Sequence, residues 1–187
     1  MIYLNEHIDR LDIQAALEAV SPQRREYALR YRHEHDRRLS LAVYLLLCEG
    51  LKKEYGITTP PELDFGTHGK PMLTNHSDVH FNMSHCNEAA VCAISDHPVG
   101  IDAESIRTYD QDLIERTMNK NEQQLIANSL TPCEEFIRLW TMKESVLKLT
   151  GKGISDDLHK VLDDVSSYRF TTEFHNGYIL TLCEYNN

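Results

Sequence analysis

The stretch that decides how this chain is interpreted is Arg138-Leu139-Trp140-Thr141-Met142-Lys143-Glu144-Ser145-Val146-Leu147-Lys148. At about 100° per residue, one side of the predicted helix is an apolar stripe of Leu139, Met142, Val146 and Leu149. An adjacent side carries Trp140, Lys143, Glu144, Leu147 and Lys148. Two lysines flanking a glutamate suggest a phosphate and metal site. The alternative is a solvated helix face, because Glu144 and Lys148 have the i,i+4 spacing of a surface ion pair.

A second acidic pattern lies about forty residues upstream, in Val99-Gly100-Ile101-Asp102-Ala103-Glu104. As a strand, this segment sends its apolar residues to one face and both Asp102 and Glu104 to the other. Two carboxylates about 7 Å apart on one face repel each other unless a cation lies between them. Mg²⁺ prefers such oxygen ligands and completes its octahedron with water and phosphate. A solvent-exposed strand face would also explain the pattern.

Composition and charge limit the possible functions. The chain has 187 residues, 41% of them hydrophobic, which suffices for one globular unit or two small lobes that share a core. A net charge of −10 argues against a protein that coats nucleic acid. No apolar run approaches twenty residues and the N-terminus lacks a basic signal region, so we expect a cytoplasmic protein without a membrane partner.

The cysteines and the arginines give two further expectations. The five cysteines are odd in number, scattered and never spaced as C-x-x-C, which predicts reduced structural thiols. Residues 24–38 hold six arginines against three acids. This basic island could bind a polyanionic small molecule, or it could be a solvated helix face.

The coarse secondary structure alternates helices with strands. Helices are expected from Ser21-Pro22 through Arg38, over 39–54 up to Gly56, near 112–118, over 122–128, and after a Thr131 to Glu134 capping box. Strands are expected at 79–83, 89–95, 99–103, 168–172 and 178–182, with Asn176-Gly177 as a turn and His85 on a loop near a strand end. This order predicts an α+β protein.

Four motifs together resemble one enzyme family. Gly100 to Glu104 and Trp140 to Lys148 are similar to the two signature motifs of the 4′-phosphopantetheinyl transferases, of the larger surfactin-synthetase-activating type. Gly69-Lys70-Pro71 and Phe81-Asn82-Met83-Ser84-His85 resemble the two motifs that precede them in this type, and the order is the same. The resemblance implies a pseudo-dimer of two similar α/β lobes, divided here as 1–98 and 99–187. The active site would lie in the cleft between the lobes.

The resemblance also implies the reaction. The 4′-phosphopantetheine arm of coenzyme A would be transferred to a serine of an acyl or peptidyl carrier protein, as by a holo-acyl-carrier-protein synthase. Asp102, Glu104 and Glu144 would bind Mg²⁺, and Glu144 is the candidate base. Lys143 and Lys148 would stabilise the pyrophosphate charge as the bond to the leaving group breaks. Adenosine 3′,5′-bisphosphate would be released.

The coenzyme A contacts follow from the same resemblance. The N-terminal lobe would contact the 3′-phosphate and the adenine, and the C-terminal lobe would carry the metal and the signature helix. The cofactor-binding residues expected are Arg30, Arg38, Gly69, Lys70, Pro71, Ser84, His85, Lys143 and Lys148. Trp140 is expected to pack beneath the site. The two arginines are chosen from the basic island, where a shift of one or two positions is possible.

Two other functions remain open on the sequence. A Mg²⁺-dependent hydrolase of nucleotide pyrophosphates would use the same carboxylates and lysines, with water in place of the carrier serine. A noncatalytic protein that binds coenzyme A or a carrier would keep the fold without the chemistry, but it would be expected to lose a metal carboxylate. We expect a monomer, because one chain would contain both halves of the cleft.

Overall fold

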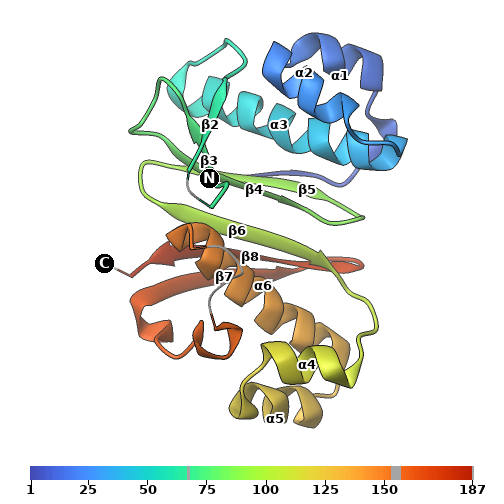
Figure 1. Ribbon diagram of the computed structural model, residues 1–187, viewed down its shortest axis with the longest axis vertical. Coiled ribbons are helices and arrows are strands. Elements are labelled where there is room, and N and C mark those ends of the chain that lie inside the picture. Colours follow the sequence, from blue (N-terminus) through green and yellow to red (C-terminus); the bar gives the residue numbers. More distant parts are fainter. Residues whose placement is uncertain (67, 153–156, 187) are drawn as a thin grey trace.

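A computed structural model describes residues 1–66, 68–152 and 157–186 (Figure 1). The helices are α1 (Ile13–Ala19), α2 (Pro22–Leu29), α3 (Glu34–Tyr55), α4 (Gln111–Thr117), α5 (Lys120–Asn128) and α6 (Pro132–Thr150). The strands are β1 (Ile2–Asn5), β2 (Leu63–Phe65), β3 (Pro71–Leu73), β4 (His80–His85), β5 (Ala90–Ser95), β6 (Val99–Ser105), β7 (Tyr168–Phe174) and β8 (Tyr178–Tyr185). Short 3-10 turns occupy Ile8–Arg10, Leu158–Lys160 and Val165–Ser167.

The strands form two antiparallel three-stranded sheets and a small hairpin. One sheet has the order β1-β5-β4, the other has the order β6-β8-β7, and β2 pairs with β3 alone. This combination of helices and antiparallel strands confirms the predicted mixed α and β class. The first sheet is built from residues before Val99 and the second from Val99 onward.

The two sheets lie between helices (Figure 1). Strand β5 is buried on both faces. Its alternate side chains point to opposite sides and enter two different cores. Cys92 and Ile94 belong to the core shared with α3, whereas Val91 and Ala93 belong to a core shared with β6 and β8. The apolar residues predicted on one face of the 99–103 strand, Val99, Ile101 and Ala103, complete this second core. The opposite face of β6 is therefore left for α6.

A glycine allows α6 to pack directly on β6. A Cβ atom at Gly100 would collide with the Ser145 carbonyl oxygen and would lie 2.6 Å from the Leu149 amide nitrogen. Both are backbone atoms of α6 and cannot rotate away. The missing side chain thus brings the helix backbone against the strand two residues before Asp102.

Some predicted boundaries were right and others were wrong. Ser21 caps α2, and α3 ends at Gly56 in the left-handed conformation, as the sequence indicated. The expected continuous helix through Arg38 is interrupted between Leu29 and Glu34, where the Arg37 guanidinium binds the free Tyr31 carbonyl. The capping box expected at Thr131 is absent, and a capping box forms instead between Asn119 and Glu122.

Further differences concern short elements and His85. Helix α1 and strands β1, β2 and β3 were not predicted, because each is too short or too irregular to show a clear period. His85 is the last residue of β4 and not part of a loop. The strands at 168–172 and 178–182 are confirmed, and so are the free thiols of all five cysteines. Over the ranges described, no helix is long and apolar enough to cross a membrane.

Candidate functional site

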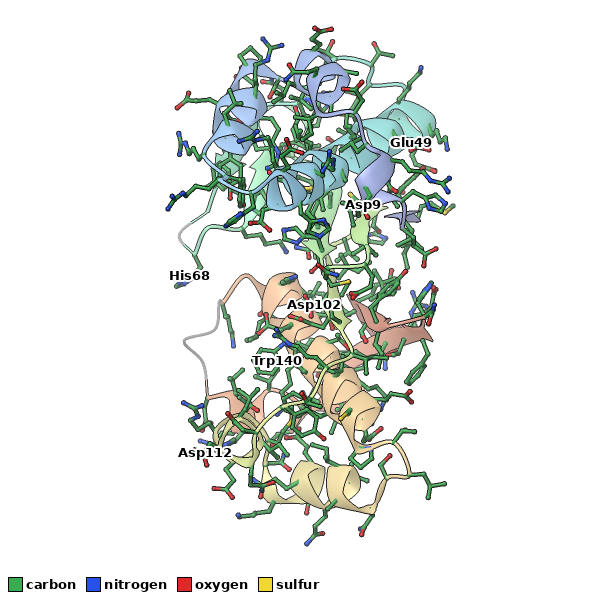
Figure 2. All side chains as sticks on the ribbon, turned by 90° about the vertical axis from the view of Figure 1, so that its right-hand side faces the viewer. Asp9, Glu49, His68, Asp102, Asp112 and Trp140 are labelled. Carbon is green, nitrogen blue, oxygen red and sulfur yellow. The ribbon has the colours of Figure 1, made fainter. Side chains whose placement is uncertain are left out.

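The predicted motifs meet near the middle of the molecule, where β4, β6, α6 and the loop before β3 come together. This region is called the waist below. Figure 2 shows Asp102 at this level, His68 at the outer margin and Trp140 further along α6. A cavity of about 270 Å³ lies here. Its lining consists of His68, Gly69, Lys70, Pro71, Asn82, Met83, Glu144, Leu147, Lys148 and Gly151.

Three side chains from three elements form a hydrogen-bonded triangle beside this cavity. The Lys148 ammonium on α6 donates to Asp102 Oδ1 on β6 at 2.6 Å and to Ser84 Oγ on β4 at 2.8 Å. The Ser84 hydroxyl donates to the same Asp102 oxygen at 2.9 Å. Asp102 is buried, and its other oxygen, Oδ2, has no hydrogen-bond partner among the described residues.

Glu144 and Glu104 complete a cluster of carboxylates around Asp102. Burial, and next the charge of Asp102, raise the pKa of Glu144 to about 7. Burial and the Asp102 charge also raise the pKa of Glu104, and a hydrogen bond from Trp140 partly opposes this shift. Glu144 Oε1 is buried without a partner among the residues described. The charge of Asp102 therefore adds to burial in disfavouring the ionised forms of Glu104 and Glu144.

These carboxylates suit a hard cation, although they do not yet form a cage. Within 1–66, 68–152 and 157–186, no three His, Cys, Asp or Glu side chains lie close enough to hold a metal ion as they stand. The partnerless oxygens of Asp102 and Glu144 are nevertheless the donor type that Mg²⁺ requires. The chemistry of the residues fits the metal, and side-chain rotation would have to bring the oxygens together.

Lys143 does not join this cluster. Its ammonium is fully buried, donating to Glu122 Oε2 on α5 at 2.8 Å and to the Leu158 carbonyl at 2.6 Å. The cause is helical geometry, since five residues at 3.6 per turn separate Lys143 from Lys148 by about 140° around the axis. The sequence had grouped both lysines on one side of the helix, and this grouping was wrong.

The loop before β3 and the end of β4 contribute two further groups. The Lys70 ammonium donates to the Leu149 carbonyl at 3.0 Å, and burial lowers its pKa. Burial, followed by the positive charge of Lys148, lowers the pKa of His85. Gly69 has a φ of 78°, a left-handed conformation that favours glycine in this turn. All three residues line the cavities at the waist.

A second cavity of about 220 Å³ adjoins the first, because Gly69, Pro71 and Met83 line both. Arg24 lies in its wall with its guanidinium 4.9 Å from the centre of the Tyr27 ring. It donates to the carbonyl and the hydroxyl of Ser40, and burial lowers its pKa. Its Nε is buried with no partner in the described part of the chain.

The two arginines chosen from the sequence lie elsewhere. Arg30 forms an exposed ion pair with Glu26, and Arg38 pairs with Glu34 while its Nε donates to the Leu11 carbonyl. The structure does not bring either to the cavities described above. Composition could not separate Arg24 from its neighbouring arginines in 24–38.

Two other residues near the site were not singled out from the sequence. The Asn82 side-chain oxygen accepts a hydrogen bond from the Ile101 amide at 3.0 Å and thereby joins β4 to β6. Glu122 holds Lys143 and caps α5 at the same time. Trp140 is half-buried and stacks on Phe136 with 6.2 Å between ring centres, which agrees with the packing role expected for it.

Comparisons with known proteins agree with this arrangement. The family model described as the 4′-phosphopantetheinyl transferase superfamily matches residues 98–185. A 4′-phosphopantetheinyl transferase of Bacillus subtilis is 31% identical over 159 residues, covering 82% of this chain and 70% of the relative. The transferase psf-1 of Bacillus pumilus is 35% identical over 156 residues, covering 81% and 66%. The transferase Sfp of Bacillus subtilis strain 168 is 29% identical over 158 residues, covering 82% and 70%.

The family match includes β6 and α6, which carry the acidic residues at the waist, and the relatives extend the similarity over most of the chain. This chain belongs to the 4′-phosphopantetheinyl transferase superfamily, a family of transferase enzymes.

Proposed function

We propose that this protein transfers the 4′-phosphopantetheine group of coenzyme A to a serine hydroxyl of an acyl or peptidyl carrier protein. Adenosine 3′,5′-bisphosphate is the other product. The observation that carries the proposal is the meeting of Asp102, Glu144 and Lys148 at one cavity, in a chain whose relatives are named 4′-phosphopantetheinyl transferases.

Asp102, Glu104 and Glu144 are the proposed ligands of Mg²⁺. Asp102 and Glu144 each have an oxygen without a partner among the described residues, and the pKa values of Glu104 and Glu144 are raised by burial and by the charge of Asp102. A cation would relieve this repulsion, which favours the assignment. The bound ion would supply charge neutralisation at the pyrophosphate. Lys148 is proposed to add positive charge beside the leaving group.

Glu144 is the proposed acceptor of the carrier serine proton. Its carboxylate lies at the cavity lined by Lys148, and its Oε1 has no partner among the described residues, so it is available to accept a proton. Lys143 is left out of the reacting groups, since its ammonium is enclosed by Glu122 and the Leu158 carbonyl. Its proposed role is to fix α6 against α5.

The coenzyme A contacts are proposed along the two adjoining cavities. Gly69, Lys70, Pro71 and His85 keep the roles expected from the sequence, because they line these cavities. Arg24 replaces Arg30 and Arg38 as the guanidinium for a phosphate of coenzyme A, since it lies in the cavity wall with a free donor. Ser84 was expected to contact coenzyme A. Its proposed role is instead to hold Asp102 and Lys148 through hydrogen bonds.

The lobes and the environment form the last part of the proposal. We propose two lobes, 1–98 and 99–187, with the cleft between them, supported by the two sheets that pack through a shared core. A monomer and a cytoplasmic location are also proposed. The free thiols accord with a reducing compartment.

The test is intact-mass spectrometry of apo-carrier proteins incubated with the protein, coenzyme A and Mg²⁺. A carrier should gain the mass of one phosphopantetheine group, and Glu144→Gln should abolish most of this gain. Glu115→Gln, the same change at an exposed position on α4, is the matched control and should leave transfer unchanged.

Two results would overturn the proposal. Cleavage of coenzyme A without any mass gain on a carrier would favour the pyrophosphate hydrolase. Binding of coenzyme A without either reaction would favour the noncatalytic protein.

A further inference from the structure

The Lys148 ammonium is the partner of a buried carboxylate that the metal is also proposed to use. Only 4% of the Asp102 side chain is exposed, against 28% of Lys148. A buried carboxylate is costly unless a cation or several donors compensate its charge. Asp102 Oδ1 receives both Lys148 and Ser84, so the compensation is concentrated on one of its two oxygens.

A divalent cation on the other oxygen would lie close to this ammonium. Mg²⁺ binds carboxylate oxygens at about 2.1 Å, and the two oxygens belong to one carboxylate group. The ion and the ammonium would therefore be like charges only a few ångströms apart, in a partly buried place where solvent screens them weakly. Binding of the cation to Asp102 therefore disfavours the bond from the Lys148 ammonium, and the bond from Lys148 disfavours binding of the cation.

The surroundings of Lys148 provide another place for its ammonium. Lys148 lines the same cavity as Lys70 and His68, which is one of the two cavities proposed to bind coenzyme A. Its side chain is more exposed than Asp102 and can rotate, whereas Asp102 is fixed on a central part of β6. An anionic substrate in the cavity would attract the released ammonium.

We propose that Lys148 and a divalent cation compete for Asp102, so that Lys148 holds the carboxylate until the ion binds and then turns toward the anionic substrate. Ser84 steadies the first of these arrangements by bonding both partners. The competition rests on the proposed function of the site. It makes Lys148 a positioning residue for Asp102 in addition to its proposed contact with the pyrophosphate.

Competition has a consequence that can be measured without any reaction. Removing the ammonium should strengthen metal binding in the absence of coenzyme A, because the ion no longer has to displace it. We expect Lys148→Met to lower the dissociation constant for Mn²⁺ about tenfold, a coupling of ordinary size for two ligands of one site. Isothermal titration calorimetry with Mn²⁺ alone, on protein treated with a chelator, gives this constant directly.

The matched control is Lys70→Met, which removes one positive charge from the lining of the same cavity. Lys70 donates to the Leu149 carbonyl and not to a carboxylate. Its removal should change the Mn²⁺ dissociation constant less than about twofold, as expected for a charge without a direct contact. Equal tightening in both variants would mean a general field effect and would overturn the competition, as would no change in Lys148→Met.

Ser84→Ala keeps the test informative if Lys148→Met fails to fold. Loss of the hydroxyl loosens the ammonium without altering the charge, so it should tighten Mn²⁺ binding about threefold, in line with one hydrogen bond. An unchanged constant would count against the proposal. Carrier modification by the wild-type protein separates the two ideas, because transfer with unresponsive metal binding would refute only the competition.

Discussion

The two long helices of this protein pack on similar sheets but bury different side chains. Helix α3 covers the β1-β5-β4 sheet, and α6 covers the β6-β8-β7 sheet. Both end at a glycine in the left-handed conformation, Gly56 and Gly151. The buried residues of α3 include no charged side chain, whereas those of α6 include Lys143 and Glu144.

This difference teaches where the chemistry of the fold is concentrated. The C-terminal half supplies all three carboxylates of the cluster, on β6 and α6. The N-terminal half supplies polar and cationic groups at the cavity walls, namely Arg24, Lys70, Ser84 and His85. Charges that would be expensive in an ordinary core are retained in α6 because each has a partner or a proposed ligand.

The largest expected effect concerns the buried charge of α6 that has only a structural partner. Lys143→Met leaves Glu122 buried beneath α6 without its cation, which should lower the free energy of unfolding by about 3 to 5 kcal/mol. Denaturant unfolding measures this loss. The KM for coenzyme A should stay within about twofold at a temperature where the variant is folded, since the Lys143 ammonium is enclosed by Glu122 and the Leu158 carbonyl.

The double variant Lys143→Met with Glu122→Leu is the control for this prediction. It removes both charges and should recover most of the stability, because an apolar pair needs no compensation. A large rise in KM for coenzyme A in the single variant would contradict this prediction and would show that Lys143 contributes to coenzyme A binding.

The second prediction compares how closely α3 and α6 pack on their sheets. Gly100→Ala forces a Cβ against the α6 backbone, whereas Gly50→Ala in α3 meets the Ile94 and Tyr3 side chains, which can move. Gly100→Ala should lower the free energy of unfolding by about 3 kcal/mol, and Gly50→Ala by about 1 kcal/mol. Thermal unfolding of both variants tests the difference. Equal losses would show that α6 can move away from β6 as easily as α3 adjusts.

The third prediction concerns the contribution of the N-terminal half to binding. Arg24→Gln removes a buried guanidinium from the cavity wall, and it should raise the KM for coenzyme A about tenfold, the worth of one charge-assisted contact. Arg30→Gln breaks only an exposed pair and should change KM less than about twofold. Steady-state kinetics with one carrier tests both. A larger effect at Arg30 would reinstate the arginine chosen from the sequence.

The smallest expected effect is a pH dependence of stability. The pKa of Glu144 is raised from 4.5 to about 7, so between these values the folded protein holds a proton that the unfolded chain releases. The resulting stability is present below the unfolded pKa and is lost as the pH rises through about 7. With screening at the cavity mouth this amounts to about 1 kcal/mol, or about 3 °C in melting temperature.

Melting curves in a chelating buffer between about pH 5 and pH 8 test this window. The side chain in Glu144→Gln stays neutral. The melting temperature of this variant relative to the wild type should therefore rise as the pH rises, whereas that of Glu115→Gln should change with pH as the wild type does. Parallel curves for the wild type and Glu144→Gln would mean that Glu144 is not the group that titrates.

The sequence predicted those parts of the fold that have a clear period or a local signal. The alternation of Val99, Ile101 and Ala103 places one face of β6 correctly, and Ser21 with Pro22 marks the start of α2. Short elements such as β1 and β3 were missed, because their pairing depends on partners far along the chain. Thr131 shows the same limit, since its spacing to Glu134 suits a capping box that its backbone conformation does not form.

The candidate site was predictable where residues share one element and less so where elements meet. The D-x-E pattern and the spacing of Glu144 and Lys148 each place two groups from local geometry alone. The spacing of five residues already directs Lys143 away from Lys148, but its partner could not be inferred, because Glu122 lies on another helix. Arg24 was hidden among similar arginines until the fold brought it beside the loop containing Gly69 and Pro71.

The bond from the Ile101 amide to the Asn82 side chain is one of the links between the two sheets. β4 and β6 lie against each other without sharing a ladder, so at this point a side chain replaces backbone pairing. Breaking one such hydrogen bond costs about 1 kcal/mol, far less than parting two paired strands. This link should therefore open more readily than a strand ladder, and the Ile101 amide should exchange its hydrogen faster than the amides of β8 beside it. Binding of a ligand that contacts both halves should slow this exchange. The exchange rate of the Ile101 amide would therefore report on such binding.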